Sequence, residues 1–271
     1  MAKPQKKHSK SKGGPNHGRK HNNNLKPKKS KVKKKTKPQS HLPPPPPLPA
    51  APEFLTTPSQ QLEFFIKEYE SANGIQLSEL ELENFKDTCI LKLSDSIPQD
   101  MDNLSEHMKA SFGSSWKEAL CKKGENSEPG SPTLLTISLS ALRSLELLRI
   151  CFAKSFGSHG ALALVKGFKL LQVSCLRNHV NVACGTPSRI KKLIDMEALG
   201  LSRLSIVVLD MYTDVKGYSL FSIPQIRDEF WELYTTHFHQ RLLDGSLRVC
   251  LYGPVDANKF KRKKAKIDAN E

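Results

Sequence analysis

The stretch Val182-Ala183-Cys184-Gly185-Thr186-Pro187-Ser188-Arg189 is an apolar run that stops abruptly at polar residues. About twenty residues later, Ile206-Val207-Val208-Leu209-Asp210-Met211-Tyr212-Thr213-Asp214 repeats the pattern. Such runs are typical of strands buried on both faces of a parallel sheet. Because ligands bind outside the carboxyl ends of such strands, the polar residues that follow each run are candidates for function.

Around these two stretches, from Ser131 onward, short apolar runs alternate with amphipathic patterns, which is typical of βαβ units. Strands are predicted over residues 133–139, 161–165, 180–184, 204–209 and 247–252. Helices are predicted over residues 141–152, 168–176, 187–196 and 223–240. Five parallel strands with crossover helices predict an α/β fold with a doubly wound, mainly parallel sheet.

Before residue 131 the patterns are helical. Thr57-Pro58 offers an N-cap with Pro at the first helical position, and Asn73-Gly74 is expected to end that helix. Ser78–Glu81 is a capping box, which predicts a second amphipathic helix. Its inner face would hold Leu82, Phe85, Cys89 and Ile90. A third helical region is predicted over about residues 102–122, and these segments either cover the sheet or supply an early strand.

Positive charge is concentrated at the two ends of the chain. Residues 1–52 contain fourteen Lys, one Arg and no acidic residue, so they carry +15, which equals the net charge of the whole chain. Residues 256–271 add +3, and residues 53–255 therefore sum to −3. The first 38 residues have almost no apolar content to offset the entropy of ordering, so we expect disorder there. The middle part is long enough to bury a sizeable core.

A dense basic run in the N-terminal arm is typical of a nuclear import signal or a polyanion contact. Its cations are Lys26, Lys28, Lys29, Lys31, Lys33, Lys34 and Lys35. Having no aromatic residue, the arm is expected to bind phosphate without reading bases, with an affinity that falls steeply with salt. A merely solubilising tail is the alternative. Pro43–Pro47 predicts a stiff spacer, or alternatively a ligand for an SH3-like groove.

Several classes of protein are excluded by composition. No segment reaches the ~20 apolar residues of a membrane span, and the first residues lack the apolar stretch of a signal peptide. The six cysteines form no C-x-x-C pair and the nine histidines are scattered, so no metal site is expected. Mostly buried free thiols in a reducing compartment fit this pattern. We read His237 and His239 as helix-surface residues.

A P-loop requires G-x-x-x-x-G-K-[ST], whose backbone N–H groups wrap phosphates and whose Lys neutralises them. The nearest candidate is residues 112–120, just before the first predicted strand of the α/β region. It lacks the Gly-Lys-Thr core, and it places bulky Trp116 and acidic Glu118 where phosphate would lie. We interpret the segment as a solvent-exposed helix start and expect no ATP and no other cofactor.

The two opening stretches resemble motifs of DEAD-box helicases. The T-P-G-R motif of that family, which holds nucleic-acid backbone, reads Thr186-Pro187-Ser188-Arg189 here, and the D-E-A-D motif reads Asp210-Met211-Tyr212-Thr213-Asp214. Hydrolysis in that pattern needs the Asp for Mg²⁺ and the adjacent Glu for the attacking water. Met211 cannot accept a proton, so Asp210 and Met211 form a degenerate ATPase position. Asp210 is then expected only to cap a strand end or turn.

The resemblance also implies an RNA-contact edge. A helix N-terminus favours phosphate, Thr186 can donate a hydroxyl hydrogen bond, and Arg189 can hold a phosphate through two bonds. An ordinary helix cap is the alternative for this motif. Arg143 lies in a segment that resembles the helicase P-T-R-E-L-A motif, and Lys166-Gly167 lies near the double-glycine contact. The candidate RNA-binding residues are Arg143, Lys166, Thr186, Arg189, Lys191 and Lys192.

Residues 53–260 resemble, segment by segment, the Cms family of small-subunit pre-ribosome proteins. That family is similar to a single RecA-like domain of a DEAD-box helicase without helicase activity. With the charge pattern, this resemblance predicts a disordered basic arm with a polyproline spacer (1–52), a helical N-terminal part (53–130), a RecA-like α/β core (131–255) and a basic C-terminal tail (256–271). It implies a protein of nucleus and nucleolus with pre-rRNA and small-subunit pre-ribosomal proteins as partners.

The resulting hypothesis is a non-catalytic RNA- and protein-binding component of these particles that assists rRNA processing and ribosome biogenesis. Two alternatives remain open at this point. One is an RNA-dependent, helicase-like ATPase that becomes active only with a partner protein. The other is a pure protein scaffold without RNA contact.

Overall fold

The computed structural model describes residues 55–121, 128–156, 161–164, 176–177 and 179–255. They all belong to one compact unit, Ala50–Glu271. The basic run of the N-terminal arm, Lys166 and most of the helix predicted over 168–176 lie outside the described residues. The predicted disorder of the two tails lies outside them as well.

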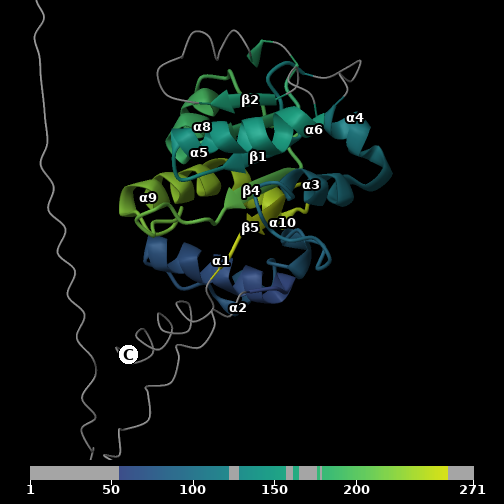
Figure 1. The fold of residues 1–271 in the computed structure, drawn as a ribbon. Coiled ribbons are helices and arrows are strands. Elements are labelled where there is room, and N and C mark those ends of the chain that lie inside the picture. The colour runs from purple at the N-terminus through teal and green to yellow at the C-terminus, as the bar shows by residue number, and fades with distance from the viewer. Residues whose placement is uncertain (1–54, 122–127, 157–160, 165–175, 178, 256–271) are drawn as a thin grey trace, which may run out of the picture. The chain divides into compact units, whose positions relative to one another are not determined.

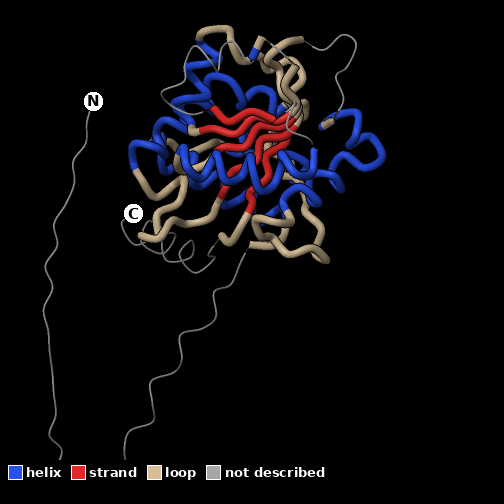
Figure 2. Tube along the Cα trace, turned by 45° about the horizontal axis from the view of Figure 1, so that its top comes forward, coloured by secondary structure: helices blue, strands red, loops and turns tan. Residues whose placement is uncertain are grey.

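A five-stranded parallel sheet forms the centre of the unit, drawn as red strands in Figure 2. Its strands are β1 (Leu134–Ile137), β2 (Ala161–Leu164), β3 (Val182–Gly185), β4 (Ile206–Asp210) and β5 (Arg248–Tyr252). They lie in the order β2-β3-β1-β4-β5, and every pairing is parallel. The predicted α/β class is confirmed, with a doubly wound parallel sheet and an N-terminal helical extension.

The strands are apolar throughout because both faces of the sheet are covered. Alternate residues enter two separate cores, as the period of a strand requires. Leu135, Ala183 and Val207 belong to one core, while Leu134 and Cys184 belong to the other. The sheet is therefore a rigid platform whose carboxyl-end residues hold fixed positions.

One face is covered by α1 (Pro58–Asn73), α8 (Pro187–Asp195) and the long helix predicted near the C-terminus. That helix is α9 (Pro224–Leu233), a π-helical turn (Tyr234–Phe238) and α10 (His239–Leu243). The other face is covered by α3 (Leu104–Phe112), α4 (Trp116–Leu120) and α5 (Ala141–Leu147), which continues through a π-helical turn (Leu148–Ala153) into α6 (Lys154–Phe156). Figure 1 shows α5 and α6 above β1, and α1 on the opposite side of the unit.

The predicted starts of the first two helices, and the predicted end of the first, are confirmed by their caps. Thr57 accepts a hydrogen bond from Gln60 N, with Pro58 at the first position, and Gly74 ends α1 with φ of 61°. The capping box at Ser78 and Glu81 also forms and begins α2 (Glu79–Leu82). These local signals are reliable because each one satisfies a backbone group that the helix leaves unpaired.

The prediction that the second helix runs on to Ile90 is wrong. After α2 the chain forms only a 3-10 turn, Asp87–Cys89, and Ile90 forms a parallel bridge with Val249 of β5. Leu91 N donates to Val249 O at 2.7 Å. Pairing with the edge strand β5 overrides the helical pattern of the sequence here. The N-terminal part therefore adds a single bridge to the sheet, in place of the additional early strand that the sequence left possible.

Among the described residues, no helix is both long and apolar enough to cross a membrane. Within the same ranges, no group of three or more His, Cys, Asp or Glu side chains is arranged to hold a metal ion.

Candidate functional site

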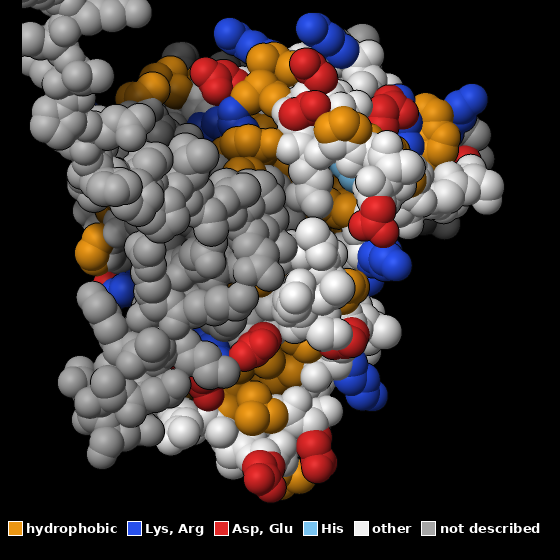
Figure 3. Space-filling view, turned by 60° about the horizontal axis from the view of Figure 1, so that its bottom comes forward, with side chains coloured by type: hydrophobic (Ala, Val, Ile, Leu, Met, Phe, Trp, Pro, Cys, Tyr) orange, Lys and Arg blue, Asp and Glu red, His pale blue; other side chains and the backbone are white. Residues whose placement is uncertain are grey.

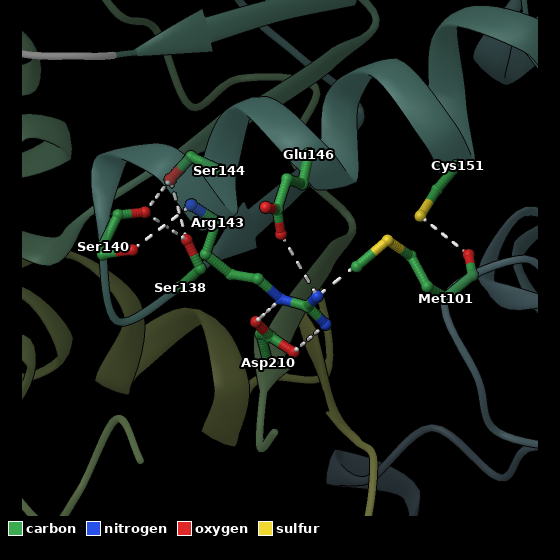
Figure 4. Close-up of polar contacts among 8 residues, drawn as sticks. All are labelled: Met101, Ser138, Ser140, Arg143, Ser144, Glu146, Cys151 and Asp210. Atoms are coloured by element: carbon green, nitrogen blue, oxygen red, sulfur yellow. Dashed lines mark hydrogen bonds and ion pairs between the residues drawn. The ribbon is translucent and has the colours of Figure 1, made fainter. Parts of the chain in front are cut away.

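At the carboxyl edge of the sheet, a guanidinium and a carboxylate meet across neighbouring strands. Ser140 follows β1 and caps α5 by accepting a hydrogen bond from Arg143 N at 3.2 Å. This cap places Arg143 in the first turn of the helix. Asp210 is the last residue of β4, which pairs with β1. Arg143 Nε donates to Asp210 Oδ2 at 2.7 Å and its Nη2 donates to Oδ1 at 3.2 Å, as Figure 4 shows.

The pair is enclosed by other side chains. The guanidinium lies over the ring of Tyr212 at 5.3 Å and approaches Met101 Sδ at 3.9 Å and Glu146 at 3.6 Å. The side chain of Asp210 is only 3% exposed and that of Arg143 is 20% exposed. A bidentate arrangement between partly buried groups is the strong form of such a contact.

Burial and pairing act in opposite directions on these two groups. Burial raises the pKa of the Asp210 carboxyl, while the hydrogen bonds and charge of Arg143 lower it; burial dominates. Burial alone would lower the pKa of Arg143, but the hydrogen bonds and charge of Asp210 raise it above its ordinary value. Arg143 therefore offsets part of the effect of burial, which disfavours the ionised form of the Asp210 carboxyl.

Asp210 and Met211, which the sequence analysis interprets as a degenerate ATPase position, lie at the end of β4. Met211 is 5% exposed and packs into the core on the α1 side of the sheet. The preceding residue, Asp210, accepts hydrogen bonds from Arg143. Both carboxylate oxygens of Asp210 already accept charged hydrogen bonds. The arrangement joins the end of β4 to the first turn of α5.

Thr186 lies at the same edge, directly after β3, where it is the N-cap of α8. Its side chain makes no capping hydrogen bond. Pro187 has no N–H group, and the N–H groups of Arg189 and Ile190 both donate to Thr186 O, at 3.1 and 3.0 Å. Ser188 is exposed, and its N–H is the remaining donor of the first turn. This helix start offers an anion a hydroxyl and a single amide.

The cations of α8 differ from one another in accessibility. The Arg189 residue is only 8% exposed, and burial lowers the pKa of its guanidinium. Lys191 Nζ forms ion pairs with Asp195 at 2.8 Å and with Glu232 at 3.4 Å. Lys192 is exposed. Lys192 is thus the most accessible of these three candidate cations.

The structure brings some of the predicted residues together and separates others. Arg143 and Thr186 both follow strands at the carboxyl edge, as the sequence predicts. However, Arg143 is on α5 and reaches toward β4, whereas Arg189 is on α8, which covers the opposite face of the sheet. The four described cations therefore do not form one continuous patch.

Sequence reasoning did not identify the side chains that enclose Arg143, although Tyr212 lies only two residues beyond Asp210. It also missed a cleft of about 490 Å³ at this edge, lined by Leu55, Gln61, Asp95, Tyr212 and Gly253 among others. Gly253 has φ of 109°, and a Cβ there would lie 2.7 Å from the Tyr212 ring, so only glycine fits. Contacts between segments this far apart leave no local sequence signal.

The segment considered as a P-loop candidate lies elsewhere. Gly113–Ser115 form an exposed 3-10 turn that leads into α4, as expected for a helix start. Trp116 packs against Phe156, with Lys109 Nζ 5.1 Å from its ring centroid. This segment covers the α5 side of the sheet.

Comparison with known proteins identifies related chains. The family model CMS1, described as "U3-containing 90S pre-ribosomal complex subunit", matches residues 3–252. The human Protein CMSS1 is 33% identical over 177 residues, which cover 64% of this chain and 60% of the relative. The Xenopus laevis Protein CMSS1 is 28% identical over 200 residues, covering 72% of this chain and 68% of the relative. The matched part of this chain thus spans about three fifths of the human relative.

Among solved structures, a Dbp5 variant from S. cerevisiae bound to Nup159, Gle1, IP6 and ADP is similar to this chain. The match has 17% sequence identity and a TM-score of 0.39, and it covers 74% of this chain and 48% of that one. A Dbp5 structure bound to RNA and ADP BeF3 matches with a TM-score of 0.33.

Proposed function

This chain belongs to the CMS1 family of 90S pre-ribosomal complex subunits, and from that premise we propose that it is a non-catalytic RNA- and protein-binding component of nucleolar small-subunit particles. In this role it assists rRNA processing. Membership in a complex subunit family implies protein partners and a part in ribosome biogenesis. Contact with pre-rRNA, the nucleolar location and the lack of catalysis are the parts that belong to the proposal.

The observation that carries the non-catalytic role is the pairing of Arg143 with Asp210. A carboxylate that is 3% exposed and accepts two bonds from a guanidinium has little remaining capacity for Mg²⁺ or water. The neighbouring Met211 is buried and has no group that could transfer a proton. Two roles that ATP hydrolysis needs are therefore unfilled at this strand end.

RNA affinity in the proposal comes mainly from the basic tails. Residues 1–52 carry +15 and residues 256–271 carry +3, which favours sequence-independent contact with phosphates. A smaller contribution comes from the start of α8, where Thr186 and Lys192 face solvent at least in part. Arg143, Arg189 and Lys191 would add less, because they are paired or buried.

Binding of the full-length chain to labelled single-stranded RNA tests these contributions separately. We expect replacement of the seven lysines of the run Lys26–Lys35 by Gln to weaken binding by about tenfold or more at 0.15 M salt and to reduce its salt dependence. Lys192→Gln should weaken it about two- to threefold. Lys216→Gln, on an exposed loop after β4, is the matched single-charge control.

Two further measurements, of ATP binding and turnover and of complex assembly, discriminate the two alternatives. A saturable rise in Tm with ATP and Mg²⁺, together with RNA-stimulated turnover, would favour a partner-completed ATPase. Loss of all RNA binding when the tails are neutralised, with the complex still assembled, would favour a protein scaffold whose folded part does not contact RNA.

A further inference from the structure

One side of α1, together with α2, forms an apolar surface rimmed by acidic residues. The groove between the two helices has a volume of about 290 Å³ and is lined by Ser59, Leu62, Glu63, Ile66, Lys67, Glu70 and Leu82. The α1 members recur at helical spacing, so they share one face. The other face of α1 packs on α9, with the Phe65 and Trp231 ring centroids 5.1 Å apart.

Large apolar side chains are exposed on α2 and on the segment that joins it to α1. Leu80 is 74% exposed, Ile75 is 43% exposed and Leu82 is 37% exposed. α2 is a single turn, Glu79–Leu82, and all of its residues are exposed. Apolar residues grouped in this way, with a polar rim, are typical of interaction sites.

The rim is strongly acidic. Residues 57–87 contain seven acidic and two basic residues, and all of the acidic ones except the buried Glu68 are at least partly exposed. Glu79 and Glu83 are exposed on either side of the two leucines. On the side of the molecule where α1 and α2 lie in Figure 1, acidic side chains stand beside exposed hydrophobic ones (Figure 3). The complementary ligand is a segment that carries several cations and at least one large apolar side chain.

We propose that this surface docks residues 256–271 of the same chain. This segment has six basic residues, Lys259, Lys261, Arg262, Lys263, Lys264 and Lys266, and it places Phe260 and Ile267 among them. The basic run of the N-terminal arm, residues 26–35, has Val32 as its only large apolar side chain. The C-terminal segment therefore meets both requirements of the surface, and the N-terminal run meets one.

The start of the segment lies close enough to reach the groove. Val255, the residue before it, accepts a hydrogen bond from Leu55 N at 3.3 Å, and Leu55 lies three residues before α1. The groove face begins at Ser59, in the first turn of that helix. From Ser59 to Glu70, about three helical turns, α1 advances about 17 Å, which six extended residues would span.

Docking would also control when the segment is available to RNA. The same cations cannot pair with the glutamates of the surface and with phosphates at once. RNA would therefore have to displace the segment from the surface. This inference does not require that RNA binding occurs, because the docked state is a property of the protein alone.

Zero-length carbodiimide crosslinking of the full-length chain, mapped by mass spectrometry, tests the proposal. We expect amide crosslinks between the lysines of 259–266 and Glu70, Glu79 or Glu83, with a yield that is independent of protein concentration and falls at 1 M salt. Phe260→Ser combined with Ile267→Ser should reduce the yield about tenfold, because it removes the apolar anchors and leaves every crosslinking group in place. Ala257→Ser combined with Ala269→Ser is the control.

Three outcomes would overturn the proposal. The first is an unchanged yield in the Phe260 and Ile267 double variant. The second is a yield that rises with concentration, which would mean contact between copies. The third is crosslinks to these glutamates that come mainly from lysines of residues 1–52.

Leu80→Ser changes the other side of the contact, at a side chain that is 74% exposed. It should reduce the crosslinking yield to the same extent as the Phe260 and Ile267 double variant.

Discussion

Arg143 and Asp210 join two segments 67 residues apart in the sequence through two charged hydrogen bonds of 2.7 and 3.2 Å. The contact fastens the helix after β1 to the end of β4 at the edge where parallel sheets bind ligands. The family resemblance indicated Arg143 for RNA contact, whereas Asp210 was expected only to cap a strand end or turn. In the fold, Arg143 instead donates hydrogen bonds to Asp210, so an internal ion pair stabilises this edge of the sheet.

Removing the cation of this pair should be costly. We expect Arg143→Met to lower the free energy of unfolding at pH 7 by about 2–4 kcal/mol, because it leaves the buried carboxylate without its partner. This loss is somewhat smaller than is usual for breaking a fully buried ion pair, because the Arg143 side chain is 20% exposed. Denaturant unfolding followed by circular dichroism measures it.

Adding Asp210→Asn to Arg143→Met should recover part of this loss, because the uncompensated charge is then gone. A double variant less stable than the single one would show that the two residues do not act as a pair. Arg203→Met is the control, since the described hydrogen bonds of Arg203 go to the neutral groups Ser131 O and Asn181 Oδ1.

The loss in Arg143→Met should depend on pH in a definite direction. Burial already raises the pKa of Asp210 above its ordinary value, and removal of Arg143 should raise it further. A group whose folded pKa is raised stabilises the fold below its unfolded pKa and loses that contribution as pH rises through the folded pKa. The difference in free energy of unfolding between Arg143→Met and wild type should therefore become smaller as pH falls from 7 to about 4. A difference that is constant with pH, as expected for Arg203→Met, would contradict this assignment.

The fold could be predicted from sequence because its strands and caps leave local signals. All five strands appear within two residues of the predicted ends, since an apolar run buried on both faces ends where polar residues begin. The N-cap of Thr57 and the stop at Gly74 follow from backbone groups that must be satisfied. The segment around Ile90 was mispredicted because its conformation is set by pairing with Val249, far along the chain.

The site was less predictable, because its chemistry depends on which side chains meet. The sequence places Arg143 and Thr186 after strands, but it does not show that Arg143 reaches across to Asp210. The burial of Arg189 likewise follows from how α8 packs. Position at a strand end is therefore encoded locally, whereas accessibility is a property of the assembled fold.

An acidic residue introduced at position 211 should not confer ATP hydrolysis. Because Met211 is 5% exposed and packs in the core, Met211→Glu should lower the free energy of unfolding by about 3 kcal/mol or more. Met211→Leu, which conserves volume and polarity, should cost less than about 1.5 kcal/mol. Equilibrium unfolding and an ATP turnover assay check both variants, and turnover in the Glu variant would contradict the account of this position.

The described cysteines should differ in reactivity by position. Cys121 is exposed, whereas Cys89, Cys151, Cys184 and Cys250 are buried. Burial raises the pKa of both Cys151 and Cys250 to about 12, so little thiolate forms at either residue. Iodoacetamide labelling with peptide mapping should modify Cys121 in the native protein and the other four only after unfolding. Labelling of Cys151 in the native state that accelerates between pH 7 and 9 would be incompatible with this burial.

An RNA crosslinking map of the intact protein in nuclear extract, with and without ATP, tests the central claim most directly. We expect crosslinks concentrated in residues 1–52 and 256–271, with a weaker group between Thr186 and Lys192, and the same pattern whether or not ATP is present. A map that changes with ATP, or one with no crosslinks on the chain, would contradict a non-catalytic RNA-binding subunit.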